Sequence, residues 1–176
     1  MPQLDPVTPG DATFAGYLQS VEWAVVDIFN GAFTFLGETA RPVAMKFQSH
    51  HSAYADALAK LAGASAAPRA NQTLELILTA RLQAATDETA ALNFLFGLEN
   101  QLVATHIFVA NSASSPDVLR LLATIVPTTA ARCATFGSLA RLSTPLVFPN
   151  GPVEGALVGD GSDIRLGFDP SLFPVG

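Results

Sequence analysis

The stretch ALNFLFGLENQLVATHIFVA, from Ala91 to Ala110, is the most apolar segment of the chain and decides how it folds. Its apolar residues recur every three or four positions, which predicts a helix with a buried face. Glu99 interrupts that face. An unpaired carboxylate in a protein core costs several kcal/mol or keeps its proton. The sequence therefore predicts that Glu99 has a buried partner on another segment.

Composition favours a helical domain with large buried faces. The 176 residues suit one domain, with 49% hydrophobic and 14% charged residues. Mean hydropathy is +0.36. A membrane-spanning helix needs roughly 20 consecutive apolar residues, and Glu99 breaks the best candidate. We therefore expect no membrane span, and we expect some of the apolar surface to be buried in an oligomer.

The charge balance argues against nucleic-acid binding. The net charge is −6, and the nine Lys and Arg residues are dispersed rather than clustered. The N-terminal sequence MPQLDPVTPGD lacks the basic and apolar regions of a signal peptide. We expect a cytoplasmic protein, or the mature form of an exported one if a signal has been removed.

Start and stop signals predict four long helices and one short one. Pro9-Gly10-Asp11 and Ser115-Pro116-Asp117 precede two of the long helices, and Gly63 ends another. The long helices are expected at about 13–35, 39–63, 86–110 and 115–142, with Thr86 as the cap of the third. A short helix at about 73–84 is expected to cross the molecule. Pro127 should kink the last helix or mark a local bulge.

The C-terminal segment has a different character. From Thr144 onward it is rich in Pro and Gly and has no helical period. We expect residues 1–143 to form a bundle and residues 144–176 to be an irregular tail. The tail is too apolar for disorder, so it should pack on the bundle or on a partner through Phe148, Phe168 and Phe173.

Each long helix carries an apolar seam with a polar break near its middle, which suggests one internal polar layer. The layer residues are Glu22, His51, Tyr54, Glu99, His106, Thr129 and Arg132. For some of them the alternative is that the seam is rotated and the side chain faces water. That alternative is strongest for His51, because His50 is adjacent.

At these residues the chain resembles the ferritin-like superfamily, and more closely bacterial ferritin-like domain proteins. In that fold two helices each supply a Glu and the other two each supply a Glu-x-x-His pair to hold two irons. Glu22 in LQSVEWAVV and Glu99 in FLFGLENQL stand where the single glutamates belong. The segments HHSAYADAL, from His50, and PTTAAR, from Pro127, resemble the other two motifs.

Departures from the family pattern imply that the di-iron site is degenerate. His51 and Tyr54 stand in one Glu-x-x-His slot, and Thr129 and Arg132 stand in the other. A single metal held by Glu22, His51 and Glu99 stays conceivable as a vestigial or weak site. Arg132, however, places a fixed positive charge in the same layer.

We therefore expect Arg132 to take the electrostatic role of the metal, donating to Glu99 or Glu22. Tyr54 and Thr129 would satisfy the remaining lone pairs. This favours a non-catalytic structural or interaction protein without a cofactor and with no catalytic residues. The alternative is a metal-binding oxidoreductase that uses iron or a single metal at Glu22, His51 and Glu99. A homodimer or another protein partner would bind through apolar faces and the tail.

Overall fold

The computed structural model describes residues 8–142, 167–168 and 170, and this part of the chain is all helical apart from turns. The four long helices are α1 (Pro9–Ala32), α2 (Ala40–Ala62), α4 (Glu88–Ser112) and α5 (Pro116–Leu139). A single 3-10 turn, η1 (Gly63–Ser65), and a short helix, α3 (Gln72–Gln83), connect α2 to α4. The predicted all-α bundle with one extra short helix is confirmed.

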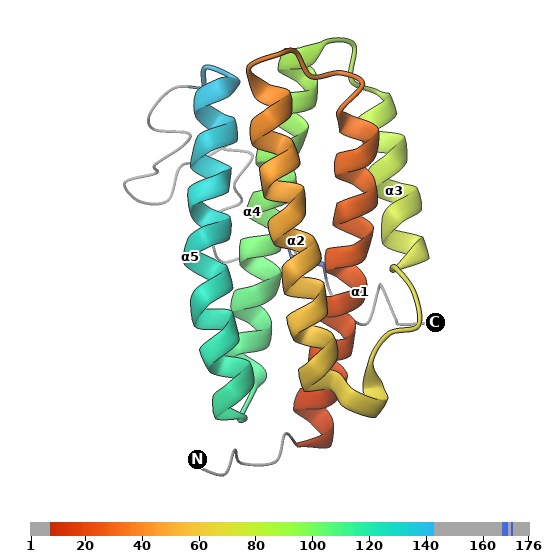
Figure 1. Ribbon diagram of the computed structural model, residues 1–176, viewed down its shortest axis with the longest axis vertical. Coiled ribbons are helices and arrows are strands. Elements are labelled where there is room, and N and C mark those ends of the chain that lie inside the picture. Colours follow the sequence, from red (N-terminus) through yellow and green to blue (C-terminus); the bar gives the residue numbers. More distant parts are fainter. Residues whose placement is uncertain (1–7, 143–166, 169, 171–176) are drawn as a thin grey trace.

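The four long helices lie side by side along the long axis (Figure 1). α1 and α2 run in opposite directions, as do α4 and α5. Because α2 ends at the opposite end of the bundle from the start of α4, the chain must return along its length. α3 makes that return beside α1, so it is a crossover along the side of the bundle.

Local capping explains most helix starts. The side chains of Thr8, Asn71 and Asp87 accept from backbone N–H groups of Asp11, Leu74 and Ala90, at the starts of α1, α3 and α4. The cap of α4 is therefore Asp87, and the prediction of Thr86 was wrong by one residue. α1 also starts earlier than predicted, because Pro9 occupies its first turn. α5 continues through Pro127 to Leu139.

The turn that follows α2 depends on two glycines, one at its start and one on the facing helix α1. Gly63 follows the last residue of the helix with a φ of 53°, a left-handed conformation that suits glycine. A Cβ on Gly16 of α1 would lie 2.0 Å from the carbonyl oxygen of Ser65 in η1. The close approach of η1 to α1 therefore depends on Gly16.

At each end of the bundle a carboxylate connects neighbouring helices. Asp11 at the start of α1 accepts from the backbone N–H and hydroxyl of Ser114 and from the N–H of Ser115, between α4 and α5. At the other end, Glu88 of α4 accepts from the N–H of Gly37, at 2.8 Å, in the turn before α2. These contacts fix how far each helix is shifted along its neighbours.

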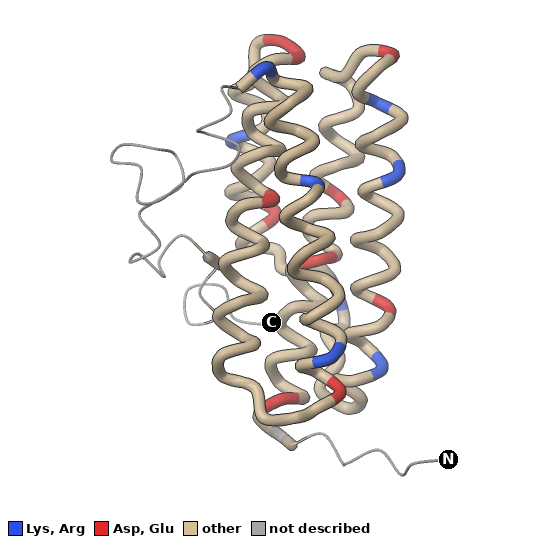
Figure 2. Tube along the Cα trace, turned by 90° about the vertical axis from the view of Figure 1, so that its left-hand side faces the viewer, with Lys and Arg blue, Asp and Glu red and all other residues tan. Residues whose placement is uncertain are grey.

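The predicted seams form the core. Leu18, Leu58, Leu102 and Leu122, one from each long helix, are no more than 1% exposed. None of the described helices is long and apolar enough to span a membrane. Charged residues are spread along the helices, as Figure 2 shows for the described part of the chain. Of the predicted tail anchors, Phe168 is buried, whereas Phe148 and Phe173 lie outside the described residues.

A candidate buried ion network

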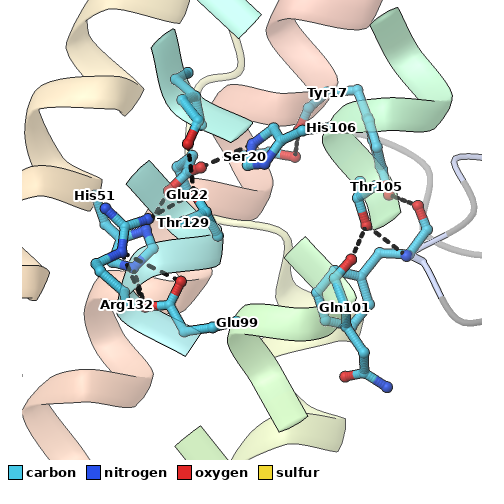
Figure 3. Close-up of polar contacts among 12 residues, drawn as sticks. Tyr17, Ser20, Glu22, His51, Glu99, Gln101, Thr105, His106, Thr129 and Arg132 are labelled. Carbon is cyan, nitrogen blue, oxygen red and sulfur yellow. Dashed lines mark hydrogen bonds and ion pairs between the residues drawn. The ribbon is translucent and has the colours of Figure 1, made fainter. Parts of the chain in front are cut away.

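Ionisable and polar side chains from all four long helices meet inside the bundle (Figure 3). All are at most 2% exposed: Glu22 from α1, His51 from α2, Glu99 and His106 from α4, and Thr129 and Arg132 from α5. Each occupies an inward position of its helix because the neighbours one turn away on the same face are apolar. The structure thus brings together six of the seven residues of the predicted polar layer.

His51 lies between two glutamates. Its Nδ1 is 2.6 Å from Oε2 of Glu22, and its Nε2 is 3.1 Å from Oε1 of Glu99. An ionised carboxylate can only accept hydrogen bonds, so both ring nitrogens must donate. With both glutamates ionised, His51 is therefore an imidazolium that bridges them.

Arg132 is the second cation of the network. Its Nε donates to Glu99 at 3.1 Å from Oε1 and 3.3 Å from Oε2, and its Nη2 donates to the hydroxyl of Thr129 at 2.8 Å. That hydroxyl donates in turn to the carbonyl of Ile125. No hydrogen bond from the Nη1 of Arg132 is found among the described residues. The guanidinium pairs with Glu99, not with Glu22.

The prediction that Thr129 and Tyr54 satisfy the remaining lone pairs of the glutamates is wrong for the described part of the chain. The hydroxyl of Thr129 donates to the carbonyl of Ile125 instead, and no hydrogen bond links Tyr54 to either carboxylate. Tyr54 is half-buried, and its ring centre lies 5.3 Å from the guanidinium carbon of Arg132. The ring of Phe47 lies 6.0 Å from the same carbon. Both distances suit a cation–π contact. Tyr54 therefore contacts the network through its ring face, because its side chain extends beside the guanidinium.

His106 completes the network on the side of Glu22. Its Nε2 lies 3.0 Å from Oε1 of Glu22, an ion-pair distance. The angles do not make this contact a hydrogen bond, and among described residues neither these two atoms nor Nδ1 has a hydrogen-bond partner. The side of the layer at Glu22 is therefore less well satisfied than the side at Glu99.

The mutual contacts set the protonation states. Burial alone would raise the pKa of Glu22, but the charge of His51 and the contacts from His106 and His51 lower this pKa to about 2. Burial alone would lower the pKa of His51, but the carboxylates of Glu99 and Glu22 raise it above 6.5. His51 and Arg132 are then the cations that face the carboxylates of Glu22 and Glu99.

The donor set does not fit a two-metal centre of the kind described for ferritin-like bundles. The residues at the other motif positions, Tyr54, Thr129 and Arg132, supply no carboxylate or imidazole. Both ring nitrogens of His51 lie at hydrogen-bond distance from glutamate oxygens, so in this arrangement neither faces a metal position. Within residues 8–142, 167–168 and 170, no three His, Cys, Asp or Glu side chains form a group that could hold a metal ion.

Tyr17 and Thr105, at the edge of this layer, make contacts that were not predicted from the sequence. Tyr17 of α1 donates its hydroxyl to the carbonyl of Phe168, and Thr105 of α4 accepts from the N–H of Phe168. Tyr17 and Thr105 are 2% and 1% exposed. A buried hydroxyl needs a hydrogen-bond partner. The presence of Tyr17 and Thr105 on helices with large buried faces was therefore the available sign that such partners exist. The partner of both hydroxyls lies far away in the sequence, so spacing within the helices could not identify it.

A comparison with family models matches residues 11–141 to a ferritin-like domain. No curated protein and no solved structure gave a significant match. The matched region covers the described helices from the first turn of α1 to the end of α5.

Proposed function

The chain belongs to the ferritin-like domain family, and we propose that it is a non-catalytic member whose buried layer is held by its own ionised side chains. It serves as a structural or interaction protein. The observation that carries this proposal is the position of His51, with one ring nitrogen on Glu22 and the other on Glu99. In metal-binding relatives carboxylates of this kind hold metal; here they hold an imidazolium.

Charge balance supports the proposal further. Buried carboxylates are tolerated when cations and hydrogen bonds compensate them. Arg132 and His51 supply this compensation from within the chain. No bound cofactor is then needed for the bundle to close, and we propose none.

A second candidate function is a metal-binding oxidoreductase. It is favoured by Oε1 of Glu22 and both ring nitrogens of His106, polar atoms on one side of the layer for which the described residues supply no hydrogen bond. These atoms could become ligands of a single metal, with His51 and Glu99 rearranged to join them. Rearrangement would separate His51 from Glu22, so this candidate requires the loss of a 2.6 Å contact.

Metal content decides between the two functions. The full chain is produced in iron-supplemented medium, and iron, manganese and zinc are measured per chain. We expect far less than one ion per chain. Stoichiometric iron in the purified protein would support the oxidoreductase and contradict the proposal. A Thr129→Glu/Arg132→His variant restores a Glu-x-x-His pair on α5 and should bind more metal, whereas Arg120→His, at an exposed position of the same helix, should not.

Apolar side chains on the surface support the interaction role. Leu76 and Ile77, neighbours on α3, are 73% and 39% exposed, and Ile107 on α4 is 44% exposed. We propose a second copy of the chain as the partner, because large apolar side chains at a surface are commonly buried by association. Light scattering tests this: Leu76→Glu should reduce the dimer fraction, and a monomeric wild-type protein would contradict it.

We propose that residues 1–143 are one domain and that residues 144–176 pack on it or on a partner, with nucleic acid not among the partners. A cytoplasmic location, or export with removal of a signal, also stays a proposal that cell fractionation can test.

A further inference from the structure

The segment Gly167–Phe168 contacts α1 and α4 in a way that ordinary core packing does not require. Phe168 is 5% exposed and belongs to the hydrophobic core, although it lies 26 residues beyond Leu142 in the sequence. Its backbone as well as its ring is held by the bundle. This combination is typical of a peptide bound in a site.

Both backbone polar groups of Phe168 bind side chains. The hydroxyl of Tyr17 donates to its carbonyl oxygen, and its N–H donates to Oγ1 of Thr105 at 2.8 Å. Thr105 is oriented for this role because its own hydroxyl hydrogen goes to the carbonyl of Gln101 at 2.7 Å (Figure 3). The lone pairs of Oγ1 are thereby left for an incoming N–H.

The residue before Phe168 is also selected. A Cβ on Gly167 would lie 3.1 Å from the backbone nitrogen and 3.2 Å from Oγ1 of Thr105, and 3.3 Å from the carbonyl carbon of Ala104. Two of these atoms are helix backbone, which cannot move aside as a flexible side chain can. The site therefore favours glycine followed by a large apolar residue.

We infer that Tyr17, Thr105 and the backbone at Ala104 form a binding site for a peptide segment with the sequence Gly-Phe. Its resident ligand is the chain's own Gly167–Phe168. We call it the Gly-Phe site. Hydrogen bonds to the main chain of the peptide supply part of the affinity. Specificity comes from the lack of room for a Cβ at Gly167 and from burial of the Phe168 ring. The inference does not depend on the role of the ion network.

Trypsin cleavage of the full chain tests the site. Arg165 precedes Gly167 by two residues, so cleavage after Arg165 needs residues 166–168 to enter the protease. Occupancy of the Gly-Phe site should protect this bond. Losing one hydrogen bond in Tyr17→Phe or Thr105→Val should speed the cut about 3- to 10-fold. Phe168→Ala should speed it about 100-fold or more. Mass spectrometry distinguishes this cut from cleavage after Arg141.

Two controls make the result specific. Thr135→Val removes a hydroxyl that also donates to a helix carbonyl four residues earlier, on exposed α5 surface, and should leave the cleavage rate unchanged. In a Phe168→Ala background, Tyr17→Phe should add nothing, because its partner is already released. Unchanged cleavage in both Tyr17→Phe and Thr105→Val would overturn the inference.

A peptide supplied separately tests binding directly. A labelled peptide of residues 163–173 is titrated to about millimolar concentration, the range a linked segment reaches effectively, into full-length Phe168→Ala. Saturable binding should appear, and a peptide with Gly167→Ala should bind at least about tenfold more weakly, in line with a clash against backbone. Equal binding of the two peptides, or none with circular dichroism still native, would overturn the inference. If Phe168→Ala does not fold, the cleavage rates of Tyr17→Phe and Thr105→Val decide.

Discussion

Nδ1 of His51 lies 2.6 Å from Oε2 of Glu22, joining residues of two antiparallel helices at a position where both side chains are fully buried. Because Nε2 of the same ring meets Glu99, a single protonated side chain connects α1, α2 and α4. Arg132 extends the connection to α5. Stability, pH response and metal affinity of this bundle should therefore all depend on the same few contacts.

Removing the guanidinium should strongly destabilise the bundle. Arg132→Ala leaves Glu99 buried with only His51 as a charged partner among the described residues, and breaking a buried pair in this way costs about 3–5 kcal/mol. The free energy of unfolding is measured by urea denaturation followed by circular dichroism.

Arg120→Ala is the matched control on the same helix. The Arg120 side chain is 71% exposed and pairs with Asp117, so its loss should cost less than about 1 kcal/mol. Equal stability of Arg132→Ala and the wild type would mean that Arg132 does not compensate Glu99.

Stability should be highest in a window of mildly acidic pH. The pKa of Glu22 is lowered from 4.5 to about 2, so its contribution is complete above pH 4.5 and is lost as the pH falls through about 2. This contribution is on the order of 3 kcal/mol. The pKa of His51 is raised from 6.5, so its contribution is complete below pH 6.5 and is lost as the pH rises through the raised value.

Denaturant unfolding across this pH range measures the window. His50→Gln is the control for the alkaline side: burial and the nearby charges of Arg132, Lys46 and His51 lower the pKa of His50, so it cannot produce a loss of stability above pH 6.5. A free energy of unfolding that stays flat well above pH 6.5 would contradict the imidazolium assignment of His51.

Two Gly→Ala substitutions should have opposite effects. At Gly16 the new Cβ would lie 2.0 Å from a backbone oxygen of η1, so α1 and η1 must separate and lose packing, at about 1–3 kcal/mol or more. At Gly97, inside α4, nothing lies within 4 Å of the new Cβ. Gly97→Ala should therefore stabilise the helix by up to about 1 kcal/mol. Melting temperatures that fall for both variants, or for neither, would contradict this reading of the α1–η1 contact.

Asp11 should contribute more than an ordinary helix-start residue. It accepts from Thr8, from two donors of Ser114 and from the N–H of Ser115, so it links the start of α1 to the connection between α4 and α5. Asp11→Asn removes the charge from these bonds and turns one acceptor into a donor. We expect a loss of about 1–3 kcal/mol. Thermal unfolding followed by circular dichroism measures the loss. Asp56→Asn, at an exposed position of α2, should cost less than about 0.5 kcal/mol in the same measurement.

The helices and the inward seams could be predicted from the sequence because both depend on local spacing. Apolar residues three and four apart define one face whatever the neighbouring helix is, and the burial of Glu22 and Glu99 followed from the apolar residues around them. The burial of His51 did not, because the adjacent His50 left a rotated seam open. The family was also within reach, since the motif positions lie on those faces.

The pairing within the layer could not be predicted. Whether Arg132 reaches Glu22 or Glu99 depends on how far the helices are shifted and rotated relative to each other, and end contacts such as Asp11–Ser114 set that shift. The contact made by Tyr54 depends on a side-chain rotamer. The partner of Tyr17 lies in a segment with no helical period, so no spacing rule pointed to it.

The bridge at His51 has a consequence for how this bundle matures. A cationic side chain is part of every newly made copy, together with the carboxylates that it pairs with. A chelator cannot remove it, and a competing ion cannot replace it. The His51 side chain needs only a proton to become a cation, and water supplies that proton below its raised pKa. With the metal-free function proposed above, we expect a cell short of iron to make this fold as readily as a cell rich in it.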